Sequence, residues 1–245
     1  MGTAAATEAP FVTVARAGGV VTLTLNRGER FNPLSKAMIA ALQDELDRIG
    51  TDPTARVVVL AAQGRGFSAG HDLKEMVANK DDAAWQSDLF ESCSRMMLTL
   101  TRIPQPVIAR VHGIATAAGC QLVSMCDLAV AADTATFALP GVNIGVFCST
   151  PAVGVVRNIG RKRAMELLLT GQPVDARTAL EWGLINRVVP VEQLDAEVAR
   201  FADAILARSA ATIAVGKRAF YRQVEAPIDA AYRETGEVMT RNMGF

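Results

Sequence analysis

Hydrophobic positions recur along the chain in two patterns, short apolar runs and longer stretches with helical spacing. Two runs rich in β-branched residues, 11–16 (FVTVAR) and 20–26 (VVTLTLN), flank the turn 17–19 (AGG) and predict a β-hairpin. Residues 36–50 (KAMIAALQDELDRIG) carry apolar side chains every three to four positions. Ser35 directly before them suits a helix N-cap, so the pattern predicts a helix there.

The order of strand, glycine-rich loop and helix then occurs twice, at 56–75 and at 106–125. Each unit starts with an apolar strand, RVVVLAA in the first and PVIARV in the second, and helical character is expected to continue from the first unit to about Arg102. Two further strands are predicted at 127–133 and 134–139. Repeated units of this kind predict an α/β fold with sites at the carboxyl ends of strands.

The pattern changes near Val191, where strand signals end and amphipathic helices continue to the last residue. This shift predicts an α/β core over 11–190 and a helical appendage over 191–245. A helical region with a broad apolar stripe is expected to pack on a neighbouring subunit, which predicts an oligomer. The first ten residues, 1–10, are predicted to form a flexible tail.

Charge and cysteine content exclude several classes of function. The 25 basic residues balance the 25 acidic ones, so we expect no nucleic-acid partner, and no apolar run approaches the roughly 20 residues that span a bilayer. The four cysteines form no CxxC pair and predict buried thiols in a reducing compartment, the cytoplasm, or the mitochondrial matrix in a eukaryote. The two histidines, His71 and His112, have no partner at helical spacing, so no metal site is expected.

Two loops have the composition of an anion-binding site. In the first loop, 67–73 (FSAGHDL), Gly70 permits a sharp turn that leaves the His71 amide facing outward. In the second loop, 116–120 (TAAGC), Ala118 and Gly119 keep side chains small where a helix begins. Two such N–H groups stabilise a developing oxyanion if they converge. The alternative is that both are ordinary strand-to-helix turns.

The letters GFSAG around Ser68 also match the G-x-S-x-G elbow of serine hydrolases. That elbow needs a separately held histidine far along the chain. After Ser68 the chain has His71, which is too close, and His112. A serine hydrolase is therefore not expected.

The segments RGFSAGHDLKEM and HGIATAAGCQLVSMCDLAVAADTATFALPGVNIGVF resemble the crotonase, or enoyl-CoA hydratase/isomerase, superfamily, and the resemblance covers essentially the whole chain. It implies a spiral core of ββα repeats, a C-terminal helical trimerisation region over 191–245, and a homotrimer or homohexamer. It also implies an acyl-CoA of fatty acid metabolism as substrate or ligand, with no other cofactor.

The resemblance further implies roles for individual residues. The amides of His71 and Ala118 would bind the thioester oxygen. The remaining substrate- and CoA-binding positions that it implies are Ala69, Gly70, Asp72, Leu73 and Gly119.

The catalytic acids of the superfamily are replaced at all three of their usual positions. These positions hold Gln121, Gly141 and Ser149, none of which exchanges a proton near neutral pH. Since loss of general acid–base help costs about 10²–10⁴ in rate per group, hydration of an enoyl thioester is expected to be weak or absent. A variant with glutamate at both Gln121 and Gly141 tests whether acids at these positions recover it.

Gln121 is expected to orient water or a substrate carbonyl, or else to cap a buried backbone group. The side chain of His71 is expected near the site rim, or against Asp72 or Glu75, with a role as base as the alternative. Cys120 and Cys148 are expected to be packing residues.

Three functions remain open at this point. The first is an enzyme that stabilises a thioester enolate with an unusual proton carrier, for which hydrolysis or decarboxylation fits better than hydration. The second is a non-catalytic acyl-CoA sensor or regulatory subunit. The third is a supporting chain in a mixed oligomer with an active paralogue.

Overall fold

The computed structural model describes residues 9–244. Of the predicted tail 1–10, all but Ala9 and Pro10 lie outside the described residues.

Two sheets form the centre of the molecule. The larger has the strand order β1-β2-β3-β5-β7-β10 and the smaller the order β4-β6-β8-β9. The strands are β1 (Val12–Ala17), β2 (Val20–Leu25), β3 (Val57–Ala62), β4 (Gly66–Ser68), β5 (Val107–Val111), β6 (Ile114–Thr116), β7 (Leu128–Ala132), β8 (Thr136–Ala138), β9 (Val174–Asp175) and β10 (Arg187–Val189).

The strands follow a spiral. The pairs β3/β4, β5/β6 and β7/β8 each contribute one strand to the larger sheet and one to the smaller sheet, and successive turns pair in parallel. A helical segment follows each pair. This arrangement confirms the predicted α/β spiral of ββα repeats, and the antiparallel pairing of β1 with β2 confirms the predicted hairpin.

Helices occur where the patterns predict them, with one difference, and three more (α5, α6 and α7) lie in a stretch for which no helix was predicted. They are α1 (Lys36–Gly50), α2 (Leu73–Ala78), α3 (Ala83–Arg102), α4 (Ala118–Met125), α5 (Ser149–Asn158), α6 (Arg161–Thr170), α7 (Ala176–Trp182), α8 (Leu194–Leu206), α9 (Ala210–Gln223) and α10 (Ile228–Asn242). Short 3₁₀ turns are η1 (Gly28–Arg30), η2 (Pro140–Ile144) and η3 (Val191–Gln193).

Capping side chains decide where two of these helices begin. Ser35 accepts a hydrogen bond from the Met38 amide and caps α1, as predicted. The helical region expected to reach about Arg102 is divided into α2 and α3. The division follows from Asp82, which accepts from the Trp85 amide and starts a new helix.

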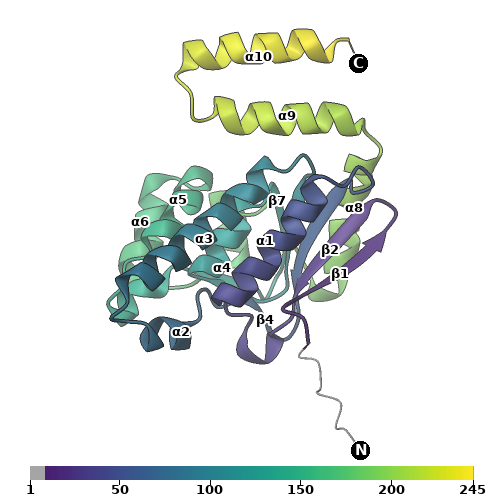
Figure 1. Ribbon diagram of the computed structural model, residues 1–245. Helices are drawn as coiled ribbons and strands as arrows, with labels where there is room; N and C mark the ends of the chain where they lie inside the picture. Colours follow the sequence, from purple (N-terminus) through teal and green to yellow (C-terminus); the bar gives the residue numbers. More distant parts are fainter. Residues whose placement is uncertain (1–8, 245) are drawn as a thin grey trace, which may run out of the picture.

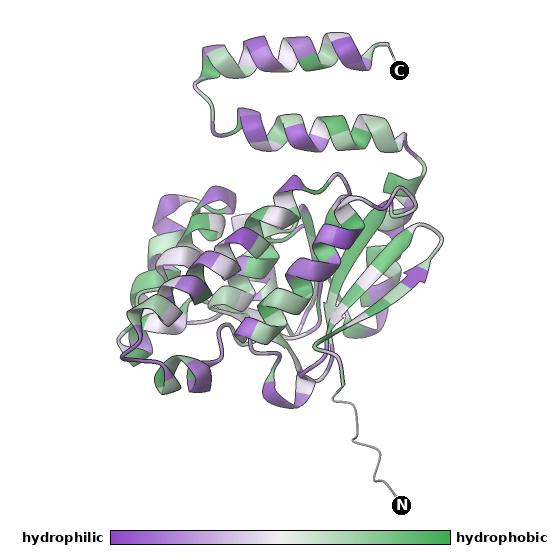
Figure 2. Ribbon diagram, in the orientation of Figure 1, coloured by the Kyte–Doolittle hydropathy of each residue, from purple (hydrophilic) through white to green (hydrophobic). Residues whose placement is uncertain are grey.

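Helices cover both faces of the larger sheet (Figure 1). α1 and α3 pack together on one face, and α8 contacts β3, β5 and β7 on the other. Every side chain of β3 is buried, as expected of a parallel strand between two helical layers. Figure 2 shows mainly apolar strands behind helices in which polar and apolar residues alternate.

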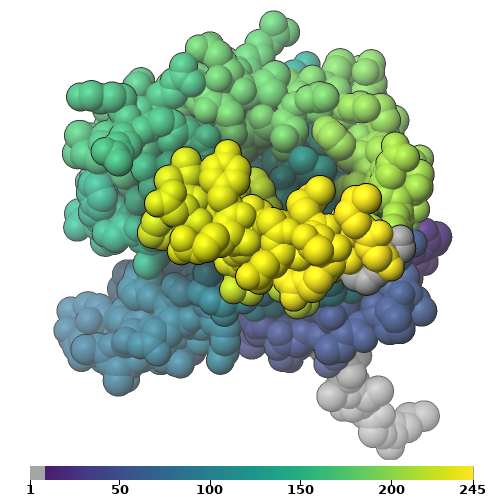
Figure 3. Space-filling view, turned by 90° about the horizontal axis from the view of Figure 1, so that it is seen from above, coloured from purple at the N-terminus to yellow at the C-terminus, as the bar shows by residue number. Residues whose placement is uncertain are grey.

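The helices α9 and α10 form a hairpin that projects from the core (Figure 1). α9 contacts α3, whereas α10 packs on α9 and crosses the upper face of the molecule in Figure 3. By its contacts α8 belongs with the sheet, so the projecting part begins at α9. The division of the chain at residue 190 stays a prediction.

A buried lysine fastens this hairpin to the core. The Lys217 ammonium donates to the carbonyls of Leu100 (2.7 Å) and Gln105 (2.8 Å) and to Asp127 Oδ2 (2.6 Å). Asp127 also accepts from the Val107 amide at 2.7 Å. Since all three lysine protons have acceptors, the charge is buried without an unpaired donor.

Large apolar side chains remain exposed along the hairpin. They are Phe220, Val224, Ile228, Tyr232, Met239 and Met243. Within residues 9–244, no helix has both the length and the apolar character to cross a bilayer.

Candidate active site

The first loop, 67–73, leaves β4 and turns sharply at Gly70. Gly70 has φ +88°, a left-handed conformation that an L side chain rarely adopts. Ser68 Oγ donates to the Asn32 carbonyl at 2.9 Å, and the Leu34 amide donates to the Gly70 carbonyl at 2.8 Å. These bonds hold the loop, and His71 lies in a bridge beside Leu34. The predicted turn at Gly70 is confirmed.

The second loop, 116–120, leaves β6 and enters α4 through a strained residue. Ala117 has φ 51° and ψ −121°, although it is not glycine. Its amide donates to the Ala138 carbonyl at 2.9 Å, and its carbonyl accepts from the Gln121 amide at 3.0 Å. Such conformations cost about 1–3 kcal/mol and concentrate at functional sites. The first amides of α4 start with no side-chain cap.

The two loops lie against each other. A Cβ built on Gly70 would stand 2.8 Å from the Ala117 Cβ and 3.0 Å from the Ala118 nitrogen. Glycine therefore permits both the turn and the close approach. Gly70 and the first residue of α4 are brought together from strands β4 and β6, which pair in parallel.

Gly119 makes a second close approach between the same segments. A Cβ at this position would lie 2.3 Å from the Ser68 carbonyl oxygen and 2.8 Å from the Ser68 Cβ. The start of α4 thus packs directly against the end of β4, and no side chain fits between them.

Gln121, one turn into α4, is a buried side chain with an unpaired oxygen. It is 5% exposed, and within residues 9–244 its Oε1 has no hydrogen-bond partner. Its own carbonyl accepts from Ser124 Oγ, but the side-chain oxygen caps no backbone group among these residues. A buried acceptor without a partner costs about 1–3 kcal/mol and calls for an explanation.

Comparison with known proteins identifies the family. The enoyl-CoA hydratase/isomerase family model matches residues 15–243. The chain is 44% identical over 238 residues to the mitochondrial enoyl-CoA hydratase domain-containing protein 3 of Xenopus laevis, covering 96% of this chain and 80% of that one. The human protein of the same name is 40% identical over 227 residues, covering 93% and 75%.

The chain belongs to the enoyl-CoA hydratase/isomerase, or crotonase, superfamily.

Solved structures of this superfamily show the same fold. An enoyl-CoA hydratase of Mycobacterium smegmatis superposes with a TM-score of 0.94 at 52% identity, covering 96% of this chain and 91% of that one. The structure of human enoyl-CoA hydratase domain-containing protein 3 gives 0.93 at 39% identity, covering 96% and 92%. The family resemblance expected from the loop segments is therefore confirmed.

The Gly141 position has no room for a side chain. A Cβ there would lie 2.2 Å from the Val146 carbonyl oxygen and 2.8 Å from Cys148 Sγ. The Val146 amide also donates to the Gly141 carbonyl at 2.9 Å, so the η2 turn closes on itself. Since a backbone atom stands in the way, a carboxylate cannot be placed at 141 without rebuilding this turn. A carboxylate introduced at Gly141 is therefore not expected to restore hydration on this backbone.

The other predicted positions differ in exposure. Ala69, Leu73 and Ser149 are exposed, and Ser149 makes one long hydrogen bond of 3.4 Å, from its Oγ to the Phe147 carbonyl. Asp72 is buried and its carboxylate is occupied. It accepts from the Lys74 amide at 3.0 Å, capping α2, and pairs with Arg30 at 2.7 Å.

The His71 ring does not lie against an acid. It packs edge-on against Phe90, with ring centroids 5.5 Å apart and an interplanar angle of 83°. Its Nε2 is buried, and among the described residues it has no hydrogen-bond partner. The prediction of a contact with Asp72 or Glu75 is wrong, because Asp72 binds Arg30 and Glu75 accepts from the Lys36 amide. The sequence carried no signal for Phe90, which lies 19 residues further along the chain (90 − 71 = 19).

Burial lowers the pKa of His71 from its ordinary value near 6.5 to about 4. The unfolded chain therefore binds one more proton than the folded protein between these values, and the stability from neutral His71 is lost as pH falls from 6.5 towards 4. We expect His71→Gln to remove about 3 kcal/mol of this pH dependence. Urea unfolding at several pH values measures it.

The comparison with wild type is needed because burial lowers the pKa of His112 as well. The contribution of His112 is common to both proteins and cancels in the difference. Equal pH dependence in wild type and His71→Gln would contradict the buried, neutral ring.

All four cysteines are buried free thiols, as predicted. Burial raises the pKa of Cys120 to about 12, with the nearby Cys148 adding to the effect. Such thiols stay protonated at neutral pH and act as packing residues.

Among residues 9–244 there is no cluster of three or more His, Cys, Asp or Glu side chains suited to a metal ion.

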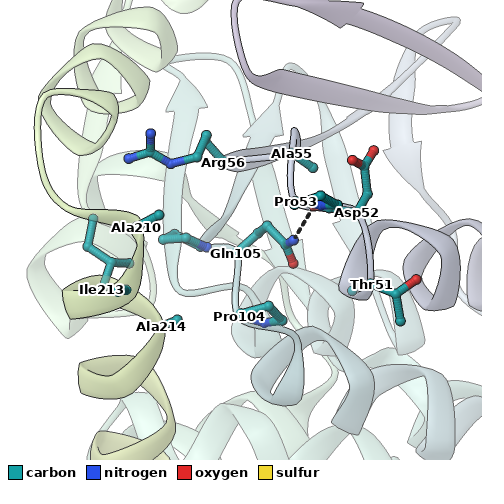
Figure 4. Close-up of a pocket in the computed structure, with 13 residues that line it drawn as sticks. Thr51, Asp52, Pro53, Ala55, Arg56, Pro104, Gln105, Ala210, Ile213 and Ala214 are labelled. Atoms are coloured by element: carbon teal, nitrogen blue, oxygen red, sulfur yellow. Dashed lines mark hydrogen bonds between the residues drawn. The ribbon is translucent and has the colours of Figure 1, made fainter.

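A separate cavity of about 330 Å³ lies where the α1–β3 loop, the α3–β5 loop and the start of α9 meet (Figure 4). Gln105 donates from Nε2 to the Ile49 carbonyl at 2.8 Å, and its Oε1 is buried without a partner in the described part of the chain. None of the predicted site residues lines this cavity. It is formed by loops distant in sequence, and the sequence patterns did not indicate it.

Proposed function

We propose that this protein binds acyl-CoA thioesters and holds the thioester oxygen between the amides of His71 and Ala118. The observation that supports the proposal is the close approach of Gly70, the residue before His71, to the Ala118 nitrogen at the ends of paired strands. Convergent amides in a buried setting are the arrangement that stabilises an enolate or tetrahedral oxyanion. Membership of the superfamily supports a CoA thioester as the ligand.

Hydration of enoyl thioesters is proposed to be weak or absent. It needs one group to activate water and another to protonate the α-carbon. Gln121 and Ser149 do not titrate near neutral pH, and position 141 has no side chain and no room for one. With two groups missing at about 10²–10⁴ each, we expect crotonyl-CoA hydration to be at least about 10⁴-fold slower than by a relative with both acids.

The test is the fate of crotonyl-CoA with the purified protein. Calorimetry measures binding, and loss of the enoyl absorbance measures hydration. We expect binding without appreciable hydration. Gln121→Glu restores at most one of the two groups, so hydration should stay slow in that variant. His112→Gln serves as control, because that ring contacts the Gly64 carbonyl at 2.9 Å and lies outside both loops.

Two results would count against these proposals. Fast hydration by the native protein would show that an unassigned group carries the proton. Absence of binding to crotonyl-CoA and to saturated acyl-CoA would show that the chain shares the fold of its relatives without the ligand.

A second candidate function is a non-catalytic acyl-CoA sensor or regulatory subunit. The blocked position at Gly141 favours it, because the turn is built so that no acid fits there. Turnover separates the two functions, since both predict binding and the sensor leaves every acyl-CoA intact.

We also propose a homotrimer or homohexamer assembled through α9 and α10. The exposed side chains Phe220, Ile228 and Tyr232 support it, because burying them against a neighbour removes a large apolar surface from water. Light scattering on the purified protein gives the mass, and a monomer would contradict the proposal.

The relatives named mitochondrial support a matrix location in a eukaryote, and a cytoplasmic one is proposed otherwise.

A further inference from the structure

His71 and Gln121 flank the two loops in the chain, and each carries a buried polar atom that has no partner in residues 9–244. One is Nε2 of His71, next to Gly70 in the first loop. The other is Oε1 of Gln121, one turn after Ala117 in the second. A neutral imidazole nitrogen accepts or donates, whereas an amide oxygen accepts. A water molecule that donates a hydrogen to such an atom satisfies it.

The charged groups around His71 have partners of their own. Asp72 in the same loop binds Arg30, and Glu75 on α2 accepts from the Lys36 amide. On α3, which carries Phe90, Asp88 pairs with Lys36 and Glu91 accepts from Ser87. α4 contributes no charged residue. Burial is the cause that lowers the pKa of the ring, so the imidazole is neutral at pH 7 and free to take a proton.

We propose that the protein hydrolyses acyl-CoA thioesters, with His71 as the base that activates a water held by Gln121. The inference rests on the proposed function, since it needs the thioester oxygen at the amides of His71 and Ala118.

The reaction balances with water as the only co-reactant. The water oxygen attacks the thioester carbonyl carbon as its proton passes to His71 Nε2, and the carbonyl oxygen becomes an oxyanion at the two amides. The carbon–sulfur bond then breaks, and the imidazolium returns the proton to the departing CoA sulfur. The products are a carboxylic acid and free CoA.

Hydrolysis suits this set of residues where hydration does not. It needs one base and no acid for carbon, and a thiol is much more acidic than an alcohol, so the CoA sulfur leaves with little assistance. A base with a low pKa is weak in the resting site. The negative charge that develops on the thioester oxygen favours the protonated ring, so the basicity of His71 rises as the reaction proceeds.

The test uses butyryl-CoA, which has no double bond and cannot be hydrated, so release of free CoA thiol reports hydrolysis alone. His71→Gln keeps the backbone amide and a polar side chain but cannot take the proton. We expect its kcat to fall by about 10²–10⁴ with KM within a few-fold of wild type. His112→Gln is the matched control. That ring contacts the Gly64 carbonyl at 2.9 Å and lies outside both loops, and the variant should keep wild-type kcat.

The pH profile gives a second readout. An ordinary imidazole base would lose activity below pH 6.5, whereas we expect wild-type kcat/KM to stay level down to about pH 5. His71→Asn is run beside His71→Gln, and retained butyryl-CoA binding shows that the fold of each is intact.

The outcomes separate the two proposals. Binding of butyryl-CoA without thiol release by wild type overturns the hydrolysis proposal and leaves the binding proposal standing. Undiminished kcat in a folded His71 variant overturns the role of His71. No binding by wild type overturns both.

Discussion

Gly119→Ala is expected to weaken acyl-CoA binding by at least about tenfold and to destabilise the fold by about 1–3 kcal/mol. The new Cβ would stand 2.3 Å from the Ser68 carbonyl oxygen. Ser68 cannot yield easily, since its Oγ donates to the Asn32 carbonyl in a buried position. The start of α4 must therefore move away from β4, and the Ala118 amide moves with it. Calorimetry with butyryl-CoA measures the affinity, and urea unfolding measures the stability.

Gly216→Ala is the matched control for this substitution. Gly216 lies inside α9, and a Cβ built there has no atom within 4 Å. Alanine favours the helix over glycine, so this variant should bind normally and be as stable as wild type or more so. If Gly119→Ala binds and unfolds like Gly216→Ala, the two loops are not held in the arrangement described.

Lys217→Met is expected to lower the free energy of unfolding by about 3–5 kcal/mol. Lys217 is 6% exposed, and its ammonium pairs with Asp127 at 2.6 Å. Burial lowers the pKa of Lys217, and the charge of Asp127 together with their hydrogen bond opposes that shift. Removing the ammonium leaves a largely buried carboxylate without its counterion and leaves the Leu100 and Gln105 carbonyls without their donor. Urea unfolding at a fixed protein concentration measures the loss.

Arg222→Met is the control on the same helix. Arg222 pairs with Glu234 at 2.8 Å, but its side chain is 66% exposed. Exposed ion pairs contribute about 0–1 kcal/mol, so this variant should stay close to wild type. If both variants lose a similar free energy of unfolding, the buried Lys217–Asp127 pair stabilises the fold no more than an exposed ion pair does.

The sequence by itself determined the local elements and the chemical inventory of the site. Strand and helix follow from the spacing of apolar side chains, and the cap at Ser35 follows from a hydroxyl placed directly before a helical pattern. The Gly70 turn was predictable because few other residues adopt its backbone conformation. The absence of acids at Gln121, Gly141 and Ser149 needed no coordinates, because it is a matter of residue identity once the family is recognised.

Only the tertiary structure decided which of these residues are in contact and which positions can accommodate a larger side chain. The contact of Gly70 with Ala118 joins residues 48 positions apart (118 − 70 = 48), and the Lys217–Asp127 pair spans 90. The His71 ring lies against Phe90 and not against an acid. Asp72 is paired with Arg30, and Glu75 accepts from a backbone amide of α1. No local pattern encodes such contacts, since they depend on how separate strands and helices pack. The packing also leaves two buried polar atoms, His71 Nε2 and Gln121 Oε1, without a partner in residues 9–244.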